Sequence, residues 1–108
     1  MKRTKQEILP TLKVKVDKDD DRAIAFKKRM EVILLEVRDI NTKHGDKTIA
    51  TVEAGNEKFN VFVNSTSLNK LIDAFGDNDD LWKGKICNLD KDIDPHFKNE
   101  MIVFDPVA

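Results

Sequence analysis

Few residues of this chain have side chains suited to catalysis or metal binding, and they are scattered. Its two histidines, His44 and His96, lack the HxH or HxxxH spacing that brings two imidazoles to one metal. The run from Asp17 to Asp21 lacks the glycine and the closing glutamate of an EF-hand loop, so we expect a solvated turn there. No phosphate loop, nucleophile elbow or nucleophile–base set is present. The sequence therefore predicts no enzyme and no metal or cofactor site.

The single cysteine, Cys87, excludes an internal disulfide and cannot by itself hold zinc. Its alternating surroundings favour a small buried hydrophobe. No long apolar run predicts a transmembrane helix, and the apolar stretch near the start is too short for a signal-peptide core. These features predict a cytoplasmic protein, and 108 residues are enough for one domain.

Aromatic rings and lysines offer a different chemistry, because rings stack on bases and cations neutralise phosphates. The net charge is only −1, with 19 basic and 20 acidic residues, but the charges are segregated along the chain, and phosphate binding depends on the local field. Large rings are buried on average, so Trp82 has a structural interpretation as well. The candidate nucleic-acid-binding residues are Lys43, His44, Lys47, Lys58, Asn60, Phe62, Trp82, Lys83, Lys85, His96 and Lys98.

These candidates must be positioned by strands. Alternation predicts a strand over residues 11–16, and residues 23–40 are β-prone, with a dense part at 30–37 that is apolar on both faces. Further strands are expected at 48–53 and 58–64. In the last of these, Phe59, Val61 and Val63 form the core face, which leaves Phe62 on the opposite face with Lys58 and Asn60.

A short helix and two more strands complete the pattern. Leu68, Leu71, Ile72 and Phe75 make one apolar stripe, with a cap expected among residues 65–67 and a stop at Gly76. A strand led by the tryptophan is expected over 81–89, with Trp82 and Ile86 on one side. A charged loop over 90–100 and a closing strand over 101–104 follow.

The order strand-strand-strand-helix-strand-strand is that of the OB-fold, a Greek-key barrel whose strand 2–3 face and flanking loops bind oligonucleotides or oligosaccharides. We therefore predict an all-β fold with one short helix. Residues 30–108 form a five-stranded OB barrel in this prediction, and residues 1–29 form a basic arm with an extra strand.

A family resemblance covers residues 30–106. Asn64-Ser65-Thr66-Ser67 leading a helix that ends at Phe75-Gly76, followed by Trp82-Lys83-Gly84-Lys85 and a last apolar strand before Pro106, resembles small OB-fold proteins of archaea and their viruses. The resemblance implies binding of single-stranded nucleic acid, DNA ahead of RNA, and brings no catalytic residues with it.

Together these observations predict a non-catalytic protein that binds a single strand by stacking and by lysine–phosphate contacts. The main alternative is a protein-interaction module, which the charge of −1 and the acidic residues 90–94 favour. A small-molecule or sugar-binding barrel has only the scaffold in its support. The charge and apolarity of the strand 2–3 face would discriminate the two leading hypotheses.

Overall fold

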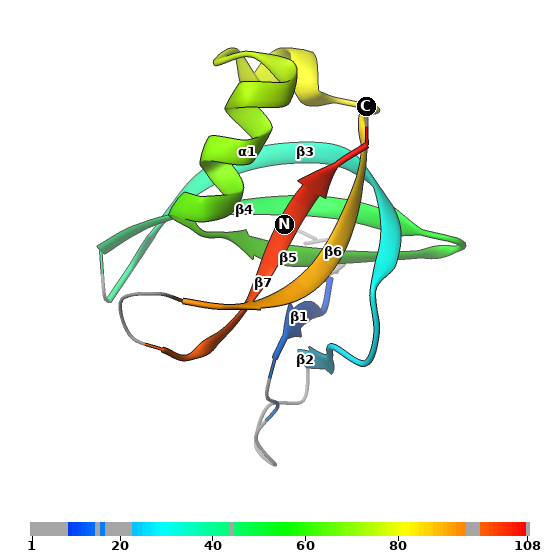
Figure 1. Ribbon diagram of the computed structural model, residues 1–108, viewed down its shortest axis with the longest axis vertical. Coiled ribbons are helices and arrows are strands. Elements are labelled where there is room, and N and C mark those ends of the chain that lie inside the picture. Colours follow the sequence, from blue (N-terminus) through cyan, green and yellow to red (C-terminus); the bar gives the residue numbers. More distant parts are fainter. Residues whose placement is uncertain (1–8, 15, 17–22, 44, 95–97, 108) are drawn as a thin grey trace, which may run out of the picture.

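The computed structural model describes residues 9–14, 16, 23–43, 45–94 and 98–107. Within them the chain is mostly β, with one α-helix, and the strands form one curled sheet in the order β2-β1-β5-β4-β3-β6-β7 (Figure 1). The strands are β1 (Thr11–Lys13), β2 (Ala23–Ala25), β3 (Met30–Thr42), β4 (Gly45–Ala54), β5 (Glu57–Val63), β6 (Ile86–Ile93) and β7 (Glu100–Pro106). The predicted β class with a single short helix is thus confirmed.

Strands β3, β4 and β5 form an antiparallel meander, and β5 carries the candidate residues Lys58, Asn60 and Phe62. β3 also pairs with β6, and β6 with β7, so the sheet curls around its core. A bulge between Leu34 and Glu36 shifts the register of β3 against β4. Such bulges bend a strand and strengthen its twist, which suits a long strand shared by both halves of a curled sheet.

The expected N-terminal strand is present but shorter than predicted. β1 ends at Lys13 and pairs in parallel with β5, Leu12 opposite Val61. β2 adds in parallel to its other edge, Leu12 opposite Ile24. The predicted acidic turn at residues 17–21 lies outside the described residues. These two short strands extend the sheet beyond β5 and bury Leu12, which is 2% exposed.

The core lies inside the curl and matches the predicted alternation of β5. Phe59, Val61 and Val63 are buried, whereas Phe62 is 40% exposed. Apolar side chains from six strands and the helix fill the interior, and burying each such side chain contributes about 1.5–3 kcal/mol. The fully buried ones include Val32, Leu34, Val52, Leu71, Leu89 and Phe104.

Helix α1 (Ser65–Phe75) follows the predicted stripe and packs against β7 (Figure 1). Leu71 is buried, and Leu68, Ile72 and Phe75 pack against the core. The helix ends as predicted at Gly76, whose φ of 92° is readily adopted only by glycine. Its cap, however, is Asn64 rather than a residue of 65–67, because the Asn64 side chain accepts the amide of Ser67. No helix in the described part of the chain has the length and apolarity to span a membrane.

The prediction of a strand that begins near the tryptophan is wrong. Residues Asp79–Trp82 form a short 3-10 helix, η1, and β6 begins only at Ile86. The Nε1 of Trp82 donates to the carbonyl oxygen of Gly76 at 2.9 Å, which turns the ring into the core. β6 then buries Cys87 and Leu89 and leaves Ile86 exposed. It continues to Ile93, so the first four residues of the predicted loop over residues 90–100 belong to a strand.

Candidate nucleic-acid interface

The outward side chains of β3, β4 and β5 form one surface, which we call the outer face. Cross-strand register places Ile49 opposite Phe62 and Thr51 opposite Asn60, and residues opposite each other project to the same side. The members of the outer face are Ile33, Glu36, Arg38 and Ile40 from β3, Lys47, Ile49, Thr51 and Glu53 from β4, and Lys58, Asn60 and Phe62 from β5.

Phe62 is the exposed ring on this face. It lies opposite Ile49, which projects to the same side and is only 5% exposed, while Phe62 itself is 40% exposed. Among the described residues, Phe62 is the only aromatic residue that is exposed. The predicted position of this ring on the face of Lys58 and Asn60 is therefore confirmed.

A row of hydrogen bonds crosses the outer face. Arg38 Nη1 donates to Thr51 Oγ1 at 2.9 Å, and Thr51 Oγ1 donates to Asn60 Oδ1 at 2.7 Å. The Glu36 carboxylate lies 3.7 Å from the same Nη1. Arg38 and Thr51 were missed in the sequence, although alternation past the bulge of β3 would place Arg38 on the face of Asn60.

Two hollows lie along β5, one toward each end. The first, of about 480 Å³, is lined by Thr51, Lys58 and Lys83 together with Glu36, Leu35 and Leu9. The second is a cleft of about 580 Å³, where β1 and β5 come near the start of β7. Its lining is mainly apolar but includes Phe62, Lys47, Thr48, Lys13 and Glu100. Asn60 lies between the two hollows in β5, so the predicted residues Lys47, Lys58, Asn60, Phe62 and Lys83 fall along one path.

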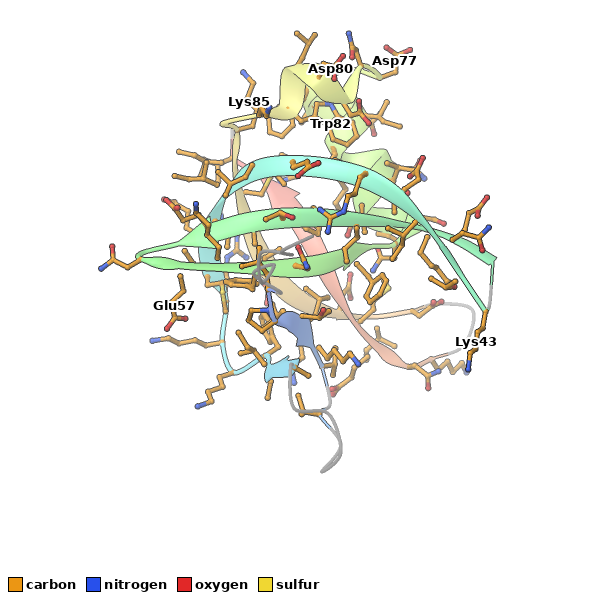
Figure 2. The ribbon with its side chains drawn as sticks, turned by 180° about the vertical axis from the view of Figure 1, so that it is seen from behind. Lys43, Glu57, Asp77, Asp80, Trp82 and Lys85 are labelled. Carbon is orange, nitrogen blue, oxygen red and sulfur yellow. The ribbon has the colours of Figure 1, made fainter. Side chains whose placement is uncertain are left out.

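Lys43 and Lys98 lie in the hairpin connections at the margin of this surface. Figure 2 shows Lys43 at the β3–β4 end of the meander and Glu57 at the opposite end, in the β4–β5 connection. Lys98 lies between β6 and β7, with a φ of 56° and its amide donated to the Asp94 carbonyl at 2.7 Å. The candidates His44 and His96 both lie outside the described residues.

Trp82 and Lys85 do not belong to the outer face. The Trp82 ring is 2% exposed and anchored to Gly76, so it cannot stack on a base in this conformation. Lys85 Nζ lies 5.8 Å from the ring centroid of Phe75, at the end of α1. Figure 2 places both residues at the η1 end of the molecule, beside Asp77 and Asp80. The strand predicted over residues 81–89 had given them the wrong orientation.

The charge of the outer face is mixed. Arg38, Lys47 and Lys58 bring three cations, and Glu36 and Glu53 bring two anions. Lys83 adds a cation at one hollow. The acidic cluster of residues 77–80 lies at the η1 end (Figure 2), where Asp79 and Asp80 line a hollow of about 360 Å³ together with Glu36 and Lys83. The surface can therefore offer cations and one ring to a ligand, and the acidic cluster borders it only at the Lys83 end.

Within the described residues, no group of three or more His, Cys, Asp or Glu side chains is arranged to hold a metal ion. Burial and, to a lesser degree, the Asp105 charge raise the pKa of the Cys87 thiol to about 12. A thiol with so high a pKa is a poor nucleophile. Cys87 thus packs as a small apolar residue, as its sequence context predicted.

Searches of protein-family models, curated proteins and solved structures return no match to this chain. The outer face must therefore be interpreted from its own geometry.

Proposed function

We propose that this protein is a non-catalytic, single-stranded nucleic-acid-binding protein, DNA ahead of RNA, whose residues 30–108 form a five-stranded OB-type barrel. The strand order supports the barrel. β3–β4–β5 form a meander, α1 separates β5 from β6, and β3 pairs with β6. Asn64 joins the end of β5 to β7 by donating to the Ile102 carbonyl at 2.8 Å. In an OB barrel, β4 and β5 correspond to strands 2 and 3, which carry the ligand.

The observation that carries the proposal is the exposed ring of Phe62 in a row with hydrogen-bonding groups and lysines. A base stacked on a protein ring contributes about 1–3 kcal/mol to binding. Lys47 on one side and Lys58 and Lys83 on the other lie where a strand crossing Phe62 would carry its phosphates. Contacts of this kind make affinity fall as salt rises, because bound counterions are released.

The test is a fluorescence-anisotropy titration of labelled oligo-dT at low and at moderate salt, with Phe62 varied. Phe62→Leu keeps an apolar side chain opposite Ile49 and removes the stacking ring, so we expect affinity to fall by about 5- to 150-fold. Leu81→Ala is the matched control, because Leu81 is 61% exposed but lies on η1. Circular dichroism confirms that both variants fold. Absence of binding at low salt by the unaltered protein would overturn the proposal.

A second candidate function is a protein-interaction module, favoured by an apolar row at the β3–β6 edge of the outer face, where Ile33 lies opposite Glu53. Ile33 of β3 pairs with Ile86 of β6, and the Val107 amide donates to the Ile86 carbonyl at 3.0 Å. The three side chains are 38%, 39% and 38% exposed. Ile86→Gln, which adds no charge, would weaken binding of a partner at this row while leaving oligonucleotide affinity unchanged. The same variant therefore separates the two functions.

A further inference from the structure

The cleft of about 580 Å³ between β1, β5 and the start of β7 is an interruption in the strand pairing. The pairing of β1 with β5 stops at Leu12 and Val61, and three residues later Asn64 joins β5 to β7 through the Ile102 carbonyl. The cleft opens between these two connections. Its volume is within the range of about 300–1,000 Å³ that is typical of small-molecule sites.

The interior of this cleft is aliphatic. Val14, which follows β1, and Met101 of β7 are only half-buried, so a ligand can reach them. Each CH₂ group that a ligand buries against such a wall tightens its binding by about four-fold. The apolar side chains behind the Phe62 ring are Leu12, Val14, Val61, Val63, Met101 and Ile102.

The neutral polar side chains of the cleft are already engaged within the protein. Thr42 Oγ1 donates to the Gly45 carbonyl at 2.7 Å, and Thr48 Oγ1 donates to Asp39 Oδ1 at 2.8 Å. Asn64 uses both ends of its amide to cap α1 and to hold β7. The many polar groups of a sugar would be buried here with few partners, which costs free energy. The cleft therefore favours a ligand with an apolar body.

The charges that line the cleft favour an anionic group on that ligand. Lys13 and Lys47 bring two cations, and Glu100 brings one anion. Glu100 Oε2 lies 3.5 Å from Lys91 Nζ, which offsets part of its charge. Lys47 is exposed and makes no ion pair within the described residues. Its amine can therefore receive a carboxylate without breaking an existing contact.

We propose that this cleft binds an amphipathic monoanion of the medium-chain carboxylate class. The aliphatic chain lies against Val14 and Met101, and the carboxylate pairs with Lys47. The volume, the aliphatic wall and the cation at its margin together select this chemistry. The site does not depend on the proposed function, because the cleft can hold such a ligand whether or not the outer face binds an oligonucleotide.

Isothermal titration calorimetry with octanoate, decanoate and octanol tests the proposal. We expect decanoate to bind up to about 15-fold more tightly than octanoate, because it buries two more CH₂ groups. Lys47→Gln should lower the octanoate/octanol affinity ratio by about 1.5- to 5-fold, as expected for the loss of an exposed ion pair. Lys58→Gln makes the same change in the other hollow and should leave the ratio unaltered.

The methyl group of Met101 reports the position of the ligand. With isotope-labelled methionine methyls, saturation with decanoate should shift the Met101 resonance but not that of Met30, which lies opposite Leu89. Val14→Phe fills the cleft and should weaken decanoate binding, with circular dichroism to confirm the fold. No binding of decanoate would overturn the proposal. An unshifted Met101, equal affinities for octanoate and decanoate, or equal ratios for Lys47→Gln and Lys58→Gln would also overturn it.

Discussion

Asn64 and Ser67 together fasten helix α1 to the edge of β7. Asn64 Oδ1 accepts the Ser67 amide at 2.8 Å, while Asn64 Nδ2 donates to the Ile102 carbonyl at 2.8 Å. Ser67 Oγ in turn accepts the Phe104 amide at 2.9 Å. The residues that cap the helix thus also connect the end of β5 to β7. This double use gives a physical reason for an asparagine and a serine three residues apart before the apolar stripe.

Ser67→Ala should destabilise the fold by about 1–3 kcal/mol, because it leaves the buried Phe104 amide without an acceptor. Asn64→Ala should cost at least about 1 kcal/mol through loss of the helix cap. Urea denaturation followed by circular dichroism measures both. Ser65→Ala, at an exposed position of the same turn, is the control and should change stability little. Equal stabilities for all three variants would contradict the conclusion that these hydrogen bonds hold α1 and the end of β5 against β7.

The Cys87 thiol predicts a loss of stability at alkaline pH. Its folded pKa of about 12 exceeds the ordinary value of 9.0, because burial and the Asp105 charge disfavour the thiolate. Below pH 9 the thiol is neutral in both the folded and the unfolded state, so its contribution to the free energy of unfolding is fully present. Between pH 9 and 12 only the unfolded chain loses the proton, so the free energy of unfolding falls by about 1.4 kcal/mol per pH unit.

The comparison with Cys87→Ala isolates this effect from the lysines, which titrate in the same range. We expect the difference in stability between the two proteins to shrink as pH rises from 9 to 12. Denaturation curves at several pH values measure that difference. A constant difference across the range would show that the thiol is no more protected in the folded chain than in the unfolded one.

Local patterns predicted the meander and the helix because each of these elements is specified by its own residues. The alternation of Phe59, Val61 and Val63 is enough to place Phe62 outside, whatever the rest of the chain does. The stripe from Leu68 to Phe75 likewise defines a helix before any partner is known. These are short-range signals, and they were right.

Trp82 was misplaced because its environment is set by hydrogen bonds that the alternation of apolar and polar residues does not reveal. Residues 81–89 alternate as a strand would, but the indole bond to Gly76 and the capping of η1 by the Asn78 side chain favour a 3-10 turn. The Arg38–Thr51–Asn60 row was missed for a similar reason. It exists only because the register of three strands, shifted by the bulge after Leu34, aligns these side chains.

The fluorescence emission of Trp82 should report on folding and not on ligand binding. Because the ring is 2% exposed, iodide should quench it weakly in the folded protein and strongly after denaturation. Saturation with oligo-dT, confirmed by anisotropy, should leave the emission nearly unchanged, since the indole lies at the η1 end (Figure 2). Strong quenching by the oligonucleotide would instead place the binding surface near η1.

The lysines of the outer face should set the salt dependence of binding. Replacing one phosphate-contacting lysine lowers the slope of log affinity against log salt by about 0.7 for a single strand. We therefore expect Lys47→Gln, Lys58→Gln and Lys83→Gln each to reduce the slope. Lys85→Gln is the matched control, because its amine lies over the Phe75 ring. An equal reduction by the control would mean that only the overall charge matters.

Glu36 should weaken binding, because its carboxylate lies 3.7 Å from Arg38 Nη1 and competes with an incoming phosphate or carbonyl. Both partners are partly exposed, with side-chain exposures of 40% for Arg38 and 60% for Glu36, so their ion pair contributes only about 0–1 kcal/mol. Glu36→Gln should therefore raise oligo-dT affinity by up to about five-fold and leave the fold stable. Glu57→Gln removes the same charge at the far end of the meander and is the control (Figure 2). If Glu36→Gln weakened binding, the carboxylate would instead orient Arg38 for the ligand.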